Sequence, residues 1–386
     1  MIHHPIKEWI PGPLGLLILQ PTPFCNIDCA YCYLTTRNSR RVMSRDILEK
    51  CFARLFEFPF LAETVTLVWH SGEPLVVPLE FYRVATILAQ NANERGVQLR
   101  QNIQTNTMLL TQDWCDFIKL NRVEVGISID GPDFVHDRYR VRRSGRGTHT
   151  QVMRGINLLR RNDIQFSAIC VITRASLGHA RKIFDFFHEL NCARLGLNFD
   201  EIEGNNPGSL RDDCYDDDVR NFLTEFFELW LDNSCPFEVR EFDRLLRAID
   251  LGSYKSELSG DEDTPGRIIS IDVNGNFSTF SPELMGHQTH HGAFSFGNVL
   301  YDSFESMIGN SSLNRIYGEI QAGRHNCQDS CQYFSLCGGG TPSNKFFETG
   351  RFDSTETRYC VTSKKIMIDQ IVRGLERRIE LAGAIS

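Results

Sequence analysis

Apolar and polar residues alternate regularly over the first two hundred positions. Six short apolar runs are typical of strands, and patterns with the period of a helix separate them. Strands are predicted at 14–20, 65–69, 100–105, 123–129, 166–172 and 195–199, and helices at 45–57, 79–94, 111–120, 150–162 and 176–190. Strands that alternate with helices form parallel sheets with right-handed connections. Because the strands are short and evenly spaced, the pattern predicts an α/β fold, a partial (β/α)6 barrel of the TIM type.

The pattern changes in the last third of the chain. A helix is predicted at 216–231, and residues 251–266 are rich in Gly, Ser, Asp, Glu and Pro. Beyond them, 268–280 indicates a hairpin with the two-residue turn Asn274-Gly275. A charged amphipathic helix follows at 363–383. We therefore expect a barrel domain over 1–250, a linker over 251–266 and a second domain over 267–386.

The charge of the chain narrows its partners. It has 386 residues, with 41 Lys and Arg against 49 Asp and Glu, and a net charge of −8. Nucleic acid is not expected as a partner, because phosphate binding needs a basic surface. No run approaches the ~20 apolar residues of a membrane helix, and the first residues lack the pattern of a signal peptide. We expect a cytoplasmic protein with no membrane contact.

Thirteen cysteines stand out in a chain expected in a reducing compartment. Disulfides are disfavoured there, so cysteines that cluster indicate metal or iron–sulfur ligation. They cluster twice, near the start and near the end. Six others are scattered through apolar or helical segments, and we expect these to be small buried hydrophobes: Cys51, Cys115, Cys170, Cys192, Cys214 and Cys235.

The first group is Cys25, Cys29 and Cys32, with Tyr31 before the last cysteine. Three thiolates can hold three irons of a 4Fe–4S cubane and leave the fourth iron open, whereas structural zinc takes four protein ligands. The segment resembles the activating loop of the radical S-adenosylmethionine (radical SAM) enzymes. The resemblance implies a 4Fe–4S cluster on these cysteines and S-adenosylmethionine bound at the open iron, which is cleaved to a 5′-deoxyadenosyl radical.

Segments at three further strand ends match the same family. Residues 71–74 resemble its Gly-Gly-Glu-Pro segment, which holds the methionine end of S-adenosylmethionine. Ser71 replaces the first glycine, a change that we expect to be tolerated on a negative φ. Residues 104–106 match the third strand of the peptide-modifying members, and 128–132 match their ribose-side strand end. The resemblance thus implies these cofactor-binding residues: Gly72, Glu73, Pro74, Thr105, Asn106, Ser128 and Asp130.

The second group comprises Cys327, Cys331, Cys337 and Cys360. It resembles part of the SPASM extension, in which peptide-modifying radical SAM enzymes use seven cysteines to hold two auxiliary clusters. Here Ser281, Asp302 and Thr341 stand near or at the positions of the missing three. The resemblance therefore implies a reduced SPASM-like extension with one auxiliary 4Fe–4S cluster. A four-cysteine zinc site on the same residues is the alternative, because thiolates alone do not distinguish the two metals.

Three histidines precede this group. His287, His290 and His291 fit neither the i, i+4 spacing of a helix nor a common ligand pair, and Gly286 and Gly292 indicate a loop. We expect solvated loop histidines.

Over nearly its full length the chain resembles radical SAM/SPASM peptide maturases of the GrrM type. The match includes residues 14–29, 238–242 on a late helical segment, and 342–345. That family implies a glycine-rich precursor peptide, a reductant protein such as flavodoxin or ferredoxin, and a cyclophane, in which an aromatic side chain is joined to the Cβ of a residue two positions later. Restoring aromaticity requires loss of an electron and a proton, so a carboxylate base is expected. The candidate bases by position are Asp200, Glu201, Glu203 and Asp302.

Two other functions remain open. A sulfatase-type maturase oxidises Cys or Ser to formylglycine, and the missing auxiliary cysteines and Ser71 weigh against it. An iron–sulfur or zinc scaffold that only binds peptide would not need a cofactor pocket, so residues 72–74 and Ser128 weigh against that reading.

Overall fold

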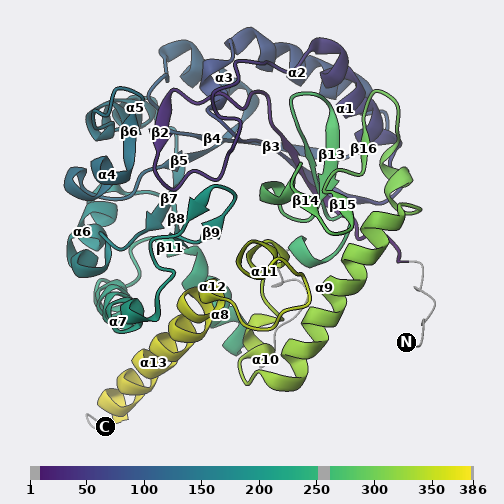
Figure 1. Cartoon of the computed structure of the whole chain (residues 1–386). Coiled ribbons are helices and arrows are strands. Elements are labelled where there is room, and N and C mark those ends of the chain that lie inside the picture. Colours follow the sequence, from purple (N-terminus) through teal and green to yellow (C-terminus); the bar gives the residue numbers. More distant parts are fainter. Residues whose placement is uncertain (1–8, 251–260, 384–386) are drawn as a thin grey trace.

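A computed structural model describes residues 9–250 and 261–383. One ten-stranded sheet organises these residues, in the order β11-β8-β7-β5-β4-β3-β1-β12-β13-β16. Six of its strands run parallel and in chain order: β1 (Leu14–Leu19), β3 (Leu61–Trp69), β4 (Gln98–Thr105), β5 (Glu124–Ser128), β7 (Phe166–Ile172) and β8 (Arg194–Phe199). Helices follow the outside of this curved sheet as an arc (Figure 1). The predicted partial barrel is confirmed.

The arc consists of helices that bury one apolar face against the sheet. They are α1 (Arg45–Glu57), α2 (Leu79–Ala92), α3 (Gln112–Asn121), α4 (Asp133–Tyr139), α5 (His149–Arg161), α6 (Ala180–Leu190) and α7 (Asp216–Asp232). Side-chain caps begin two of them: Ser44 accepts from Ile47 N at α1, and Thr111 accepts from Trp114 N at α3. Five helices agree closely with the prediction, and α6 starts later than expected because the 3-10 turn Leu177–His179 precedes it.

The strand β7 shows how the sheet separates core from cavity. Phe166, Ala168, Cys170 and Ile172 are buried, while the residues between them are half-buried. Successive side chains of a strand point to opposite faces. One set packs under the helices, and Ile169 and Val171 of the other set line a cavity inside the barrel.

The expected hairpin continues the barrel sheet. Its strand β12 (Ile268–Ile271) pairs in parallel with β1, and β13 (Asn276–Thr279) pairs antiparallel with β12 and with β16 (Gly297–Asn298). The predicted two-residue turn is wrong. Gly275 N donates to the Asp272 carbonyl at 3.0 Å, and Gly275 has a φ of 84°, so the loop is a turn followed by a left-handed glycine.

The residues before the expected linker differ from the prediction. Residues 251–260 lie outside the described part of the chain. Before them, 238–242 is not one helical segment: β11 (Glu238–Val239) pairs with β8 at the sheet edge, and α8 (Arg240–Asp250) follows.

The remaining helices cover the open side of the barrel. They are α9 (Ser311–Ser330), α10 (Phe334–Cys337), α11 (Pro342–Thr349), α12 (Arg358–Cys360) and α13 (Met367–Gly383). The yellow α13 runs to the C-terminus against α7 (Figure 1), and the π-helical turn Val361–Ile366 joins it to α12. In the described residues no helix has both the length and the apolar character needed to span a membrane.

The scattered cysteines divide into two kinds. Cys51, Cys115, Cys170 and Cys192 are buried, as predicted. Cys214 and Cys235 are exposed, so the prediction of buried hydrophobes is wrong for these two.

Candidate active site

The cysteines of the first group lie in the loop that follows β1. The short strand β2 (Ile27–Cys29) pairs with β6 (Arg140–Arg142) and holds the loop against the barrel. Arg37 ties its two ends: the Arg37 carbonyl accepts from Cys25 N at 3.3 Å, and the Arg37 guanidinium donates to the Cys29 carbonyl at 2.8 Å. All three cysteines are free and half-buried, and all line one cavity of about 260 Å³.

The three thiols are near one another but too widely spaced for a single zinc ion. Burial raises the pKa of the Cys25 thiol, and the charges of Glu73, Cys29 and Cys32 raise it further. Zinc–sulfur bonds of about 2.3 Å in a tetrahedral site place the sulfur atoms about 3.8 Å apart. Among the described residues, no three cysteine sulfurs lie within 4.8 Å of one another. Cysteines that each bind a different iron corner of a cubane are further apart, so this spacing fits an iron–sulfur cluster.

The turn after β3 brings the backbone against this loop. Ser71 and Gly72 have φ values of 77° and 58°, and Glu73 N donates to the Phe24 carbonyl at 2.9 Å. A Cβ on Gly72 would lie 2.5 Å from the Phe24 oxygen and 2.6 Å from the Thr22 oxygen, so only glycine fits. The negative φ on which tolerance of serine at this position was expected to depend is not found. The serine is held in a left-handed conformation that favours glycine.

Glu73 is fully buried at the cavity wall. Its carboxylate accepts from the Thr105 hydroxyl at 2.6 Å, from Asn106 N at 2.7 Å and from Leu75 N at 3.0 Å. Burial raises its pKa to about 7 in spite of these three donors. A buried carboxylate is stabilised in its charged form by a nearby cation. The ammonium group of S-adenosylmethionine is such a cation, so the residues present fit this cofactor.

Of the predicted cofactor-binding residues, Ser128 lines the cavity and Pro74 does not. Ser128 Oγ accepts from Gln104 Nε2 at 2.9 Å, and both side chains line the cavity. Pro74 is not among the residues that line it. Pro74 begins the 3-10 turn Pro74–Val76, and its carbonyl accepts from Tyr82 Oη at 2.6 Å.

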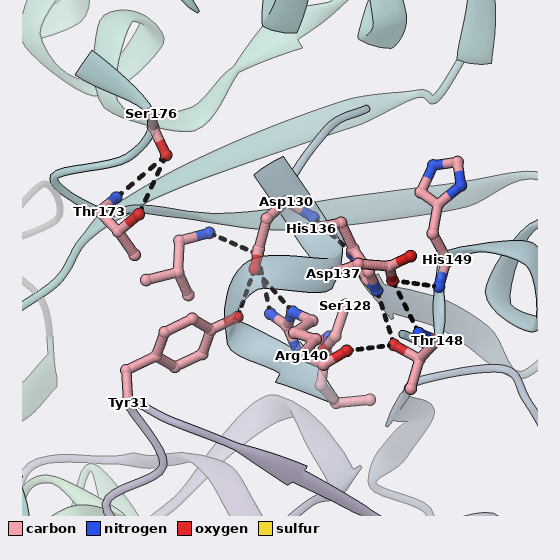
Figure 2. A network of polar contacts seen from close by, with 12 residues as sticks. Tyr31, Ser128, Asp130, His136, Asp137, Arg140, Thr148, His149, Thr173 and Ser176 are labelled. Carbon is pink, nitrogen blue, oxygen red and sulfur yellow. Dashed lines mark hydrogen bonds and ion pairs between the residues drawn. The ribbon is translucent and has the colours of Figure 1, made fainter. Parts of the chain in front are cut away.

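Asp130 belongs to a buried polar network behind the cavity wall. It accepts from Tyr31 Oη, from Arg140 Nε at 3.0 Å and Nη2 at 3.1 Å, and from Val171 N at 3.0 Å (Figure 2). Its backbone N–H donates to His136 Nδ1 at 3.2 Å, and burial lowers the pKa of that imidazole to about 4. Tyr31 and Arg140 line the cavity, whereas Asp130 does not. Asp130 thus holds two side chains of the cavity wall, and its expected contact with the cofactor stays a prediction.

The predicted bases separate in the structure. Asp200, Glu201 and Glu203 follow β8 and line the cavity with the cysteines, but Asp302 lies outside it and accepts from Asn298 N at 2.8 Å. Sequence reasoning missed Glu283, which lies against this group and lines the same cavity. No motif indicates it, because it comes from the turn after the C-terminal hairpin.

The carboxylates beside this cavity oppose one another's ionisation. Burial, followed by the charge of Glu283, raises the pKa of both Glu201 and Glu203 well above the usual range. Burial and Glu262 raise the pKa of Glu283 to about 7. Asp200 accepts from Asn206 Nδ2 at 2.7 Å and from Ser209 N at 2.8 Å, so its position is fixed. A protonated carboxyl and a carboxylate can therefore coexist here at neutral pH.

The second cysteine group lines a separate cavity of about 300 Å³. Cys327 is buried in the last turn of α9 and Cys331 ends that helix, while Cys337 and Cys360 come from α10 and α12. Lys345 Nζ lies 3.7 Å from Cys327 Sγ, a positive charge beside the thiols that was not predicted. All three residues 338–340 have positive φ, which explains the run of glycines.

The positions that replace the missing cysteines come only partly together. Ser281 Oγ donates to Ser343 Oγ at 3.3 Å, and Ser281 and Thr341 line a third cavity, of about 400 Å³, inside the barrel. Glu201, Glu203 and Glu283 line this cavity as well as the first one. Asp302 does not line it.

The three histidines lie on loops, as predicted, and His290 is exposed, but His287 and His291 are half-buried and all three have partners. His287 packs edge-on against Phe347 with ring centroids 5.0 Å apart. His290 and His291 both contact Glu319.

Comparisons with known proteins agree with this geometry. A model of the Radical SAM superfamily matches residues 19–187. The chain is 42% identical to an uncharacterized protein of Synechocystis sp., covering 96% of this chain and 94% of that one. It is 27% identical to a serine-type anaerobic sulfatase-maturating enzyme of Bacteroides thetaiotaomicron, over 87% of this chain and 84% of the relative.

Solved structures share the fold. The structure of anSMEcpe with bound AdoMet and the Cp18Cys peptide is similar with a TM-score of 0.77 at 24% identity, covering 97% of this chain and all of that one. Streptococcus suis SuiB bound to its precursor peptide SuiA is similar with a TM-score of 0.64 at 16% identity, covering 92% of this chain and 76% of that one. The superfamily match and the barrel geometry agree: residues 19–187 form a domain of the radical SAM superfamily.

Proposed function

We propose that this radical SAM enzyme matures a glycine-rich precursor peptide by forming cyclophanes, each joining an aromatic side chain to the Cβ of a residue two positions later. One observation carries the proposal: four further cysteines line one cavity, and carboxylates line another together with Ser281 and Thr341, which stand where the SPASM pattern has cysteines. Ring formation requires an electron acceptor and a proton acceptor, and these two features provide one of each.

The residues that would hold the cofactors divide between the two cavities. Cys25, Cys29 and Cys32 would hold the activating 4Fe–4S cluster, with S-adenosylmethionine against Glu73, Thr105, Asn106 and Ser128. The second group would hold one auxiliary cluster. Together these groups supply one-electron chemistry at the Cβ–H bond of the peptide. Electrons would come from a cytoplasmic reductant protein such as flavodoxin or ferredoxin.

Glu203 is the proposed base. Asp200 accepts from two donors, and Glu201 accepts from Asn344 Nδ2. Among the described residues the Glu203 carboxylate has no hydrogen-bond partner. The charge of Cys32 contributes to its raised pKa, and both residues line the same cavity. A carboxylate that accepts no hydrogen bond from the protein remains free to accept a proton from the substrate.

The first experiment asks whether rings form. The anaerobically reconstituted enzyme is incubated with S-adenosylmethionine, reductant and a glycine-rich precursor peptide. We expect 5′-deoxyadenosine, a loss of about two hydrogens per ring, and no tandem-mass fragments between the joined residues. A mass change of another size, or an unchanged mass, contradicts ring formation.

A sulfatase-maturase activity is the second candidate, because relatives with that name align over most of the chain. Oxidation of serine to formylglycine also removes two hydrogens, so mass alone does not decide. The aldehyde reacts with a hydrazide probe, whereas a cyclophane does not. A labelled product with complete fragmentation would establish the maturase activity and refute the ring.

Three cysteine variants test the roles assigned to the activating and the auxiliary cluster sites. Cys331→Ala should still cleave S-adenosylmethionine but release little cross-linked peptide, since the electron acceptor is lost. Cys25→Ala should lose both activities. The matched control is Cys214→Ala, an exposed thiol outside both cavities, which should keep both. Full product formation by Cys331→Ala contradicts the assigned electron path.

A further inference from the structure

Two adjacent histidines form the tip of a small hairpin in the C-terminal extension. Strands β14 (Gln288–Thr289) and β15 (Gly292–Ala293) pair antiparallel, so His290 and His291 are the two turn residues. The turn is well fixed. Thr289 Oγ1 donates to the Gly292 carbonyl at 2.8 Å and accepts from His291 N at 3.1 Å.

Both imidazoles converge on one carboxylate. His290 Nε2 lies 2.7 Å and His291 Nε2 3.0 Å from the same oxygen, Oε1 of Glu319 on α9. The two rings are 4.0 Å apart between centroids. The other oxygen, Glu319 Oε2, is buried and has no hydrogen-bond partner among the described residues. Within residues 9–250 and 261–383, this is the only set of three potential ligand atoms that all lie within 4.8 Å of one another.

A simple hydrogen-bonded cluster explains this arrangement incompletely. A carboxylate with two donors on one oxygen and a buried, unpartnered second oxygen leaves an acceptor unsatisfied, which is unfavourable. Arg351 is near enough for its charge to interact with Glu319, but its guanidinium pairs with Asp353 at 2.5 Å and makes no hydrogen bond to Glu319 Oε2. A cation coordinated by both imidazoles and by the carboxylate would satisfy all the groups at once.

We propose that His290, His291 and Glu319 form a divalent transition-metal site of the zinc type. Two imidazole nitrogens and one carboxylate oxygen suit Zn²⁺ and neighbouring ions such as Co²⁺ or Ni²⁺. Ca²⁺ and Mg²⁺ are disfavoured because they prefer oxygen ligands. Each histidine binds through Nε2 in its neutral form, so a protonated imidazole releases its proton to solvent when the metal enters. His290 is 47% exposed on its side chain, which leaves room for a water ligand.

The site is distinct from the iron–sulfur sites and acts as a clamp. Glu319 and Cys327 are eight residues apart on α9, or about 12 Å along the helix axis. The metal would fasten the β14–β15 hairpin to the helix that carries two of the auxiliary cysteines. Ser312 Oγ, which donates to the His291 carbonyl, is a further contact between the same turn and the same helix.

The test is a Zn²⁺ titration of the cluster-loaded enzyme under anaerobic conditions, in competition with a chromophoric chelator. We expect one ion per chain with micromolar or tighter affinity, and a rise in the thermal unfolding temperature on addition of Zn²⁺. Glu319→Gln and His291→Asn should each weaken binding by more than about tenfold and abolish the thermal shift. The control His325→Asn alters an exposed histidine on the same helix and should bind as the unaltered enzyme does.

Two outcomes would overturn the proposal. One is Zn²⁺ binding that is equally strong in the Glu319→Gln and His291→Asn variants, which would assign the ion to exposed thiols such as Cys214 or Cys235. The other is no binding below millimolar Zn²⁺ in the unaltered enzyme. If those variants do not fold, His290→Asn replaces the most exposed ligand and tests the same loss of affinity.

Discussion

The ion pair between Asp130 and Arg140 offers a direct test of how the cofactor side of the barrel is held together. Their side chains are only 2% and 8% exposed, and the carboxylate accepts four hydrogen bonds from three residues. Asp130→Asn keeps the shape but removes the charge, which leaves the Arg140 guanidinium buried without a counter-ion. Removing one partner of a buried pair destabilises a protein by about 3–5 kcal/mol.

The matched control makes the same chemical change at the surface. Asp217 is 94% exposed and lies 3.6 Å from Arg220 on α7. Exposed pairs contribute about 0–1 kcal/mol, so Asp217→Asn should lower the unfolding free energy by less than about 1 kcal/mol. Urea unfolding followed by circular dichroism, under reducing and anaerobic conditions, measures both variants, with an unchanged m-value as the sign that only stability changed.

The double variant Asp130→Asn/Arg140→Gln completes the cycle. It should be less destabilised than the sum of the two single variants, because removing the second partner relieves the uncompensated charge. Two results would contradict this role of the buried pair: a loss of stability for Asp130→Asn as small as that for Asp217→Asn, or single changes whose effects add without coupling. Should Asp130→Asn not fold, Tyr31→Phe removes one of the four bonds and should cost about 1 kcal/mol.

Further predictions concern the clusters, the carboxylates and the strained turn. Reconstituted enzyme should contain about eight irons per chain, and joint replacement of Cys25, Cys29 and Cys32 should halve this value; about twelve would mean an additional cluster with non-cysteine ligands. The pKa of Glu283 rises from 4.5 to about 7 on folding. Between pH 4.5 and about 7 the folded chain therefore binds more protons than the unfolded chain. The unfolding free energy should fall as pH rises through this window. Glu283→Gln should flatten that decline in pH-dependent urea unfolding, whereas an unchanged slope would assign it to other groups. Ser71→Gly should stabilise the fold by up to about 1 kcal/mol, since it relieves a left-handed serine; a loss of stability would show that the buried side chain contributes more than the backbone strain removes.

The alternation of strands and helices and the two cysteine groups could be predicted from local residue patterns alone. Strand and helix periods are local properties, so β7 and α1 agree with their predicted bounds without knowledge of their neighbours. The three-cysteine loop and the turn at Gly72 and Glu73 were likewise readable, because each lies within a few residues at the end of one strand.

The contacts between groups far apart in the chain could not be predicted in this way, and the folded structure reveals them. It joined Glu283 to Glu201 and Glu203, separated Asp302 from them, placed Asp130 behind the cavity wall and brought Glu319 to His290 and His291. It also gave Ser71 a positive φ that residue spacing does not reveal. The physical reason is that burial, charge repulsion and backbone conformation depend on elements that pack together from far along the chain, and local residue patterns do not specify these contacts.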